Sequence, residues 1–156
     1  QHVDPIDTGT LVDIFRDDPH ASLLGTDALR DGVDVPGSSL RLVVMEGVPW
    51  AKPSVLHAAR RRAAADQAGG GSGYDDRIVR ARLAQAFGRL IRRRDDRGAF
   101  VLLSAAVPSR LLSAFPPGVS VTRVTLDEAV TRVTERLAGL SQALPSRVPL
   151  GHEADS

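Results

Sequence analysis

Two short runs that are almost entirely apolar place the strongest constraint on how this chain folds. Residues 40–46 read Leu-Arg-Leu-Val-Val-Met-Glu, and residues 99–104 read Ala-Phe-Val-Leu-Leu-Ser. Such runs are typical of parallel strands that are covered on both faces. Two helical patterns, at residues 53–67 and 75–94, lie between the two runs. This alternation predicts an α/β layer fold, with a mainly parallel sheet flanked by helices.

The rest of the chain supplies shorter elements. We expect residues 8–17 to form a helix whose start is capped by the side chain of Asp7 or Thr8. Residues 68–73 read Ala-Gly-Gly-Gly-Ser-Gly, and we expect them to form a flexible surface loop. The remaining expected elements are a strand-length run at 21–26, a short helix at 108–114, an edge strand at 119–124 and an amphipathic helix at 126–140. We expect one domain over residues 1–140 and a flexible tail over 141–156.

Composition argues against several classes of site. The chain has no cysteine, so it holds no disulfide, no thiolate metal site and no iron–sulfur cluster. Its four histidines are scattered without metal-ligand spacing. No run of about 18 apolar residues is present, so we expect no membrane partner. The chain begins with glutamine and has no clear strand before Asp7, so we expect it to be a segment of a longer protein.

The helical pattern at 75–94 separates apolar from polar side chains. At about 3.6 residues per turn, one side gathers an apolar stripe made of Val79, Leu83, Ala86, Phe87 and Leu90. Gln85, Arg89 and Arg92 gather roughly opposite, and Gly88 lies beside them. A glycine within a helix costs about 1 kcal/mol relative to alanine, so Gly88 indicates the close approach of another backbone or a ligand. Two guanidinium groups and an amide suit a polyanion such as a nucleoside triphosphate, although an arginine-rich face is usually only solvated.

Two other features each allow two interpretations. Residues 47–50 leave the strand at 40–46 from its carboxyl end, which is where ligands bind in open α/β sheets. Trp50 is the only tryptophan, and it either stacks on a base or closes the hydrophobic core. The run Arg60-Arg61-Arg62 either contacts nucleic acid or forms a solvated surface.

Two blocks of sequence resemble motifs V and VI of superfamily 2 helicases, in the order found in that superfamily. The first block is residues 24–37, Leu-Gly-Thr-Asp-Ala-Leu-Arg-Asp-Gly-Val-Asp-Val-Pro-Gly, and the second is residues 85–92, Gln-Ala-Phe-Gly-Arg-Leu-Ile-Arg. Val48-Pro49-Trp50 between the blocks and Asp96-Arg97-Gly98 after them narrow the resemblance to the DinG/XPD family. Most of residues 7–118 follows that family's order. One departure is Asp31, where the family usually has glutamate.

The resemblance implies the second RecA-like domain of an ATP-dependent DNA helicase, a P-loop NTPase-type fold. In this family the second block supplies a glutamine and arginines that reach the γ-phosphate of the nucleotide. By position these are Gln85, Arg89 and Arg92, with Arg92 as the arginine finger. Gly88 belongs to the same block and is expected to face the nucleotide.

The first block is implied to line both the nucleotide cleft and the track for single-stranded DNA. By position, Gly32 and Asp34 belong to the nucleotide cleft, and Gly25 and Thr26 belong to the DNA track. Family members generally translocate 5′ to 3′ on single-stranded DNA.

The resemblance also implies partners outside this chain. The Walker A and acidic Walker B motifs are absent here and are expected in an upstream first RecA-like domain, which would bind most of the ATP and Mg²⁺. Any iron–sulfur cluster would also lie outside this chain. We therefore expect negligible ATP hydrolysis by the chain alone, and a monomeric parent protein in the cytoplasm of a bacterium. Two other functions stay open: a stand-alone nucleic-acid-binding module that uses the arginines of residues 60–97, and an inactive helicase-like scaffold for protein interactions.

Overall fold

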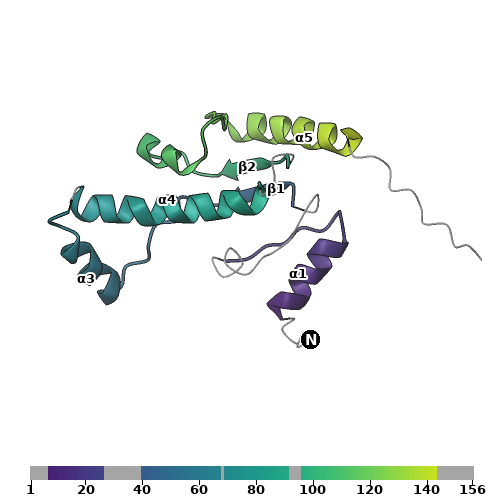
Figure 1. The fold of residues 1–156 in the computed structure, drawn as a ribbon. Coiled ribbons are helices and arrows are strands. Elements are labelled where there is room, and N and C mark those ends of the chain that lie inside the picture. Colours follow the sequence, from purple (N-terminus) through teal and green to yellow (C-terminus); the bar gives the residue numbers. More distant parts are fainter. Residues whose placement is uncertain (1–6, 27–39, 68, 92–95, 144–156) are drawn as a thin grey trace, which may run out of the picture.

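The computed structural model describes residues 7–26, 40–67, 69–91 and 96–143. Helices and strands alternate along these residues (Figure 1). The elements, in chain order, are α1 (Thr8–Asp17), β1 (Leu42–Met45), α3 (Val55–Ala63), α4 (Gly70–Leu90), β2 (Ala99–Leu102), the 3₁₀ helix η2 (Ser109–Ala114) and α5 (Leu126–Ala143). None of the helices in these ranges is long and apolar enough to cross a membrane.

The sheet is small and parallel. β1 pairs with β2 in a register that sets Leu42 opposite Ala99 and Met45 opposite Leu102. The two strands lie between α4 and α5 (Figure 1), and the chain passes from β1 to β2 through α3 and α4. The α/β class and the parallel pairing are therefore confirmed, with a sheet of two strands in the described ranges.

The prediction of two further strands, at residues 21–26 and 119–124, was wrong. Residues 21–26 and 119–124 have irregular backbone. A strand needs the backbone of a neighbouring strand to pair with, and neither segment is hydrogen-bonded to β1 or β2 in the part of the chain that the structure describes. Arg123 instead donates a hydrogen bond from Nη2 to the carbonyl oxygen of Val107, at 2.5 Å. An alternating sequence pattern therefore did not suffice to form an edge strand.

The core lies where α4 crosses the sheet and η2. Val79 and Leu83 of α4 and Leu111 of η2 are completely buried, and Met45, Val48, Leu102, Ala114 and Phe115 pack around them. Three phenylalanines extend this core: the ring centroids of Phe87, Phe100 and Phe115 lie 5.4–6.0 Å apart. Two of the three contacts are edge-to-face, a geometry that aromatic quadrupoles favour. α4 is thus fixed against both strands by its apolar stripe.

The first helix forms as its sequence predicts. The carboxylate of Asp7 accepts hydrogen bonds from the backbone nitrogens of Gly9 and Thr10 and from the Thr10 hydroxyl. These bonds satisfy amide groups that have no partner within the helix. After the helix, Arg41 donates a hydrogen bond to the carbonyl oxygen of Pro19 at 3.2 Å, which ties this segment to the start of the sheet.

Both ends of α4 differ from the prediction. The glycine-rich segment is not a surface loop, because α4 begins at Gly70 and includes Gly71 and Gly73. A Cβ atom at Gly71 would lie 2.9 Å from Cγ of Arg61, so the absence of a side chain lets α3 pack closely on this turn. The helix ends at Leu90, and Ile91 is already extended. Residues 92–94 lie outside the described residues.

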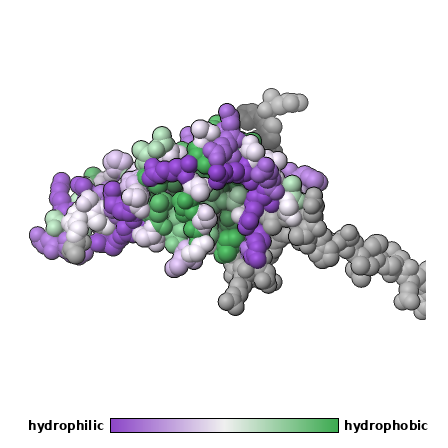
Figure 2. Space-filling view, turned by 90° about the horizontal axis from the view of Figure 1, so that it is seen from above, coloured by the Kyte–Doolittle hydropathy of each residue, from purple (hydrophilic) through white to green (hydrophobic). Residues whose placement is uncertain are grey.

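The outer surfaces show two more differences. Val44 is 51% exposed, so β1 is not covered on both faces as expected. α5 continues to Ala143, three residues beyond its predicted end. The face of the molecule seen in Figure 2 has an apolar area in its middle, bordered by hydrophilic side chains. Val121, Leu126 and Val130, in and before α5, are among the exposed large apolar residues.

Candidate functional site

The outward face of α4 carries the side chains that the sequence analysis selected. Gln85 and Gly88 are exposed, and Arg89 is half-buried, while Leu83 and Leu90 on the other side are buried. The helical periodicity therefore separated the two faces correctly. Apart from its chain neighbours and the backbone of its own helix, no atom in the described ranges lies within 4 Å of a Cβ built at Gly88. The surface over this glycine is open to an approaching group.

The end of α4 lies against the beginning of both strands. A Cβ at Gly98, just before β2, would lie 2.5 Å from Cδ1 of Leu90 and 2.8 Å from the carbonyl oxygen of Arg41. The same carbonyl accepts a hydrogen bond from the backbone nitrogen of Ala99, at 3.0 Å. Gly98 thus allows α4, β1 and β2 to meet. This packing holds the last turn of α4, which carries Arg89, at the edge where the strands begin.

The structure describes only part of the predicted set. Gly25 and Thr26 are exposed in the irregular segment after α1, and in the described ranges no hydrogen bond joins them to α4. Gly32, Asp34 and Arg92 lie outside the described residues. The residues that are brought together on one described element are Gln85, Gly88 and Arg89.

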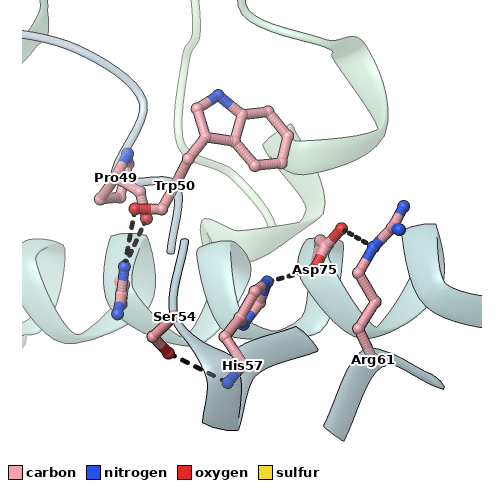
Figure 3. A network of polar contacts seen from close by, with 7 residues as sticks. Pro49, Trp50, Ser54, His57, Arg61 and Asp75 are labelled. Carbon is pink, nitrogen blue, oxygen red and sulfur yellow. Dashed lines mark hydrogen bonds and ion pairs between the residues drawn. The ribbon is translucent and has the colours of Figure 1, made fainter. Parts of the chain in front are cut away.

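A polar contact fixes the loop after β1 to the middle of α4. The Nη1 atom of Arg82 donates hydrogen bonds to the carbonyl oxygens of Pro49 and Trp50, at 2.9 and 3.0 Å. The Trp50 side chain is 44% exposed, so it does not close the core. Its indole ring points away from the start of α3 (Figure 3). The sequence had marked Trp50 but not the arginine that holds its backbone.

A second contact joins α3 to the first turns of α4 (Figure 3). Nε of Arg61 lies 2.8 Å from Oδ2 of Asp75, and Nε2 of His57 lies 3.1 Å from its Oδ1. Ser54 caps α3 by accepting a hydrogen bond from the backbone nitrogen of His57, at 3.0 Å. This network was not predicted from the sequence. The sequence feature that could have indicated it is the spacing of His57 and Arg61, which are four residues apart and therefore share one face of a helix.

A third contact joins α4 to η2. Asp76 is 7% exposed, and its Oδ2 accepts a hydrogen bond from Nε of Arg110 at 2.6 Å. This hydrogen bond, with the attraction of the opposite charge, raises the pKa of Arg110 above its ordinary value. The second carboxylate oxygen of Asp76 is buried and has no hydrogen-bond partner among the described residues. The carboxylate of Asp76 is therefore a buried charged group, and the guanidinium of Arg110 is its counter-ion.

Two hollows border the segment that enters α3. One, of about 490 Å³, is lined by Arg61, Arg62 and Gly71 among others. The other, of about 400 Å³, lies between α3 and α4 and is lined by Lys52 and Arg60 among others. Within the described ranges, no group of three or more histidine, aspartate or glutamate residues is arranged to hold a metal ion.

Comparison with known proteins gives a consistent set of relatives. A family model described as "Helicase C-terminal domain" matches residues 3–116. The chain is 40% identical over 136 residues to the ATP-dependent helicase DinG of Mycobacterium tuberculosis (strain ATCC 25618 / H37Rv), which covers 80% of this chain and 20% of that protein. It is 32% identical over 120 residues to the ATP-dependent DNA helicase YoaA of Escherichia coli (strain K12), covering 70% of this chain and 18% of that protein.

A third relative carries a different name. The chain is 32% identical over 127 residues to the 3'-5' exonuclease DinG of Bacillus subtilis (strain 168), covering 77% of this chain and 14% of that protein. The chain thus spans about a fifth or less of the length of these relatives. No solved structure gives a significant match.

Proposed function

This chain belongs to the family of helicase C-terminal domains, among those of the DinG-type helicases, and on that premise we propose that it supplies the second RecA-like half of an ATP-dependent DNA helicase or translocase. The first RecA-like half is proposed to lie upstream in the same polypeptide and to bind most of the ATP and Mg²⁺. The chain alone is then inactive as an ATPase, because hydrolysis needs groups from both halves.

The observation that carries this proposal is the open surface over Gly88. Gln85 and Arg89 flank this glycine on the exposed side of α4. The described part of the chain offers no packing reason for a glycine here, because a Cβ would meet nothing within 4 Å. The cost of a glycine in a helix, about 1 kcal/mol, is explained if a group from outside this chain approaches the backbone closely.

The donor set fits the terminal phosphate of a nucleotide. Phosphoryl transfer needs positioning and charge stabilisation rather than covalent chemistry from the protein. A guanidinium fork matches phosphate oxygens and stays charged at physiological pH. We assign charge stabilisation to Arg92 as the arginine finger, with Arg89 assisting, and positioning of the γ-phosphate or of the attacking water to Gln85. The bound nucleotide with its metal supplies the phosphoryl group that is transferred to water.

The remaining assignments follow from position in the family. Gly32 and Asp34 are proposed to line the nucleotide cleft, and Gly25 and Thr26 are proposed to contact single-stranded DNA. The exposure of Gly25 and Thr26 is compatible with such a contact. We further propose that the parent protein works as a monomer in the bacterial cytoplasm.

The contacts of α4 support a mechanical role. The helix is tied to α3 through Asp75, to η2 through Asp76 and to the loop after β1 through Arg82. A helix held at three points moves with its surroundings as one body. Closure of the two halves around a nucleotide at Gln85 and Arg89 would therefore displace the whole domain, and with it any bound DNA.

Two matched glycine substitutions test the proposal. Gly88→Ala in α4 and Gly139→Ala in α5 each add a methyl group that meets nothing within 4 Å. Each should stabilise its helix by about 1 kcal/mol. Only Gly88→Ala should impair ATP turnover stimulated by single-stranded DNA in the full-length polypeptide. A misplacement of about 1 Å in a catalytic arrangement lowers rates by roughly a hundredfold.

The outcomes separate a role in catalysis from a role in folding. More stable proteins, with turnover lost only in Gly88→Ala, would support close approach at this helix. Normal turnover in Gly88→Ala would contradict it. Equal losses in both variants would show that added rigidity alone lowers the rate, which would also count against the proposal.

A further inference from the structure

The two faces of the sheet differ in how far they are covered. Met45 and Leu102 pack against the buried core, on the side where α4 contacts both strands. Side chains of successive residues point to opposite faces of a strand, so Val44 and Leu103 point away from α4. Leu103 keeps the geometry of the ladder, because its backbone nitrogen donates a hydrogen bond to the carbonyl oxygen of Met45 at 2.8 Å. Val44 is 51% exposed and Leu103 is 45% exposed, so this second face is only partly covered.

The helix α5 lies on this second face, with the strands between it and α4 (Figure 1). It packs mainly against β2, which leaves the side chain of Val44 on β1 exposed. The apolar stripe of α5 is also wider than this contact uses. The stripe covers about 100° of the helix circumference and consists of Leu126, Ala129, Val130, Val133 and Leu137. Of these, Leu126 is 64% exposed and Val130 is 57% exposed. Figure 2 views the molecule from the side of α5 and shows an apolar area bordered by hydrophilic side chains.

This open sheet face, defined by Val44, Leu103, Leu126 and Val130, does not have the character of a surface that faces water. The four residues of β1 are all apolar, whereas a strand with one face in water alternates apolar and polar residues. An exposed apolar area with a polar border marks a place where another element or protein binds. A sheet of two strands also needs further packing to be stable. The open sheet face is therefore suited to burial under another apolar element.

We propose that a helix from the upstream part of the same polypeptide packs on the open sheet face, over Val44 and beside Leu126 and Val130. Parallel sheets bury both faces under helices, and α5 alone covers only part of this face. The chain spans about a fifth or less of the length of its relatives, so a polypeptide of that size has ample residues outside this chain. Burial of a sheet face joins it to the core, which fits a permanent contact within one polypeptide better than a transient partner.

Membership of the family does not define this contact, because α5 lies beyond residues 3–116, which the family model matches. The contact assigns to α5 the role of one wall of the binding site for the upstream helix. The inference rests on the proposed function in one respect, which is the existence of upstream residues in the same polypeptide. It does not depend on ATP hydrolysis or on DNA.

Thiol accessibility in the full-length polypeptide tests the contact. This chain has no cysteine, so Val44→Cys, Leu126→Cys and the control Val55→Cys each add one thiol to it. Val55 is 89% exposed on α3, which is less than twice the exposure of Val44 at 51%. Labelling by N-ethylmaleimide would be followed by mass spectrometry of the peptide that carries the new thiol, in native and in unfolded protein. Burial under a helix should slow labelling at both test positions by about tenfold or more, because the thiol reacts only when the contact opens. Val55→Cys should react nearly as fast as it does in the unfolded protein.

A photo-cross-linking side chain identifies the covering segment. Benzoylphenylalanine in place of Val130 would be irradiated in the full-length polypeptide, and the cross-linked peptides would be identified by mass spectrometry. Slow labelling at positions 44 and 126, with cross-links to upstream residues in the monomeric product, would support the contact. Labelling at both positions as fast as in Val55→Cys would overturn it, and so would cross-links formed only within this chain or only to a second copy. ATP turnover of the wild type, measured separately, tests the proposed function without bearing on these results.

Discussion

Alanine at position 98 should destabilise this fold, although alanine is the better helix and strand former. The Cβ of Gly98→Ala would lie 2.5 Å from Cδ1 of Leu90, 3.0 Å from its Cγ and 2.8 Å from the carbonyl oxygen of Arg41. Leu90 is only 4% exposed, so its side chain has little room to move. The carbonyl also accepts the hydrogen bond of Ala99 and cannot retreat without weakening the pairing of the strands.

The size of the effect follows from overpacking. Added methyl groups in packed regions typically cost about 1–3 kcal/mol. For a chain of this length, each kcal/mol lowers the melting temperature by about 2–4 °C, so we expect a decrease of roughly 2–12 °C. Thermal unfolding followed by far-ultraviolet circular dichroism measures it, with Gly139→Ala as the control that should melt higher. An unchanged or higher melting temperature for Gly98→Ala would refute the packing of α4 against the start of the sheet.

Two further predictions concern charged groups. Arg110→Ala should lower the melting temperature more than Arg132→Ala, because it leaves the carboxylate of Asp76 buried without a counter-ion. Arg132, in contrast, pairs with Glu128 on the exposed surface of α5. Equal decreases in the two variants would contradict the buried pair. Hydrogen bonds from the Thr10 hydroxyl and from backbone amides hold the pKa of Asp7 below its ordinary value of 3.8. Its contribution is therefore present above that value and is lost as the pH falls through the lower pKa of the folded state. Acid titration of melting temperature should show a steeper loss in the wild type than in Asp7→Asn, and parallel curves would argue against the cap.

Local rules predicted the elements whose contacts are local. α1 has the predicted bounds, because its cap and its apolar spacing all lie within eleven residues of sequence. The two faces of α4 were also predicted, since Leu83 and Gln85 point to different sides of any regular helix.

Contacts between distant residues decided the rest. The glycine-rich start of α4 is helical because Arg61 packs over Gly71 and reaches Asp75, and neither contact is visible in the glycines themselves. The pattern at 119–124 did not form a strand, because a strand also requires a pairing neighbour. Trp50 was expected either to stack or to close the core. The structure shows it 44% exposed, with its backbone held by Arg82, and the sequence pattern around Trp50 does not contain that long-range contact.

The sequence predicted only part of the candidate site. Periodicity alone selected Gln85, Arg89 and Arg92, with Gly88 beside them, as an outward set on one helix, and the structure confirms the exposure of Gln85 and Gly88. Arg89 is half-buried, which a helical wheel does not predict. The roles of Arg92, Gly32 and Asp34 were assigned from resemblance, and they stay predictions because these residues lie outside the described residues.

The most direct test of the central claim is ATP turnover, stimulated by single-stranded DNA, in the full-length polypeptide with Arg92→Ala. Arg80→Ala, at another position of the helix that precedes Arg92, is the matched control. An arginine at the γ-phosphate is typically worth about 10³–10⁵ in rate. We predict a loss of roughly a thousandfold or more for Arg92→Ala, with DNA binding and folding intact and with near-normal turnover in the control. Equal turnover in Arg92→Ala and the wild type would contradict the claim that this chain supplies the arginine finger.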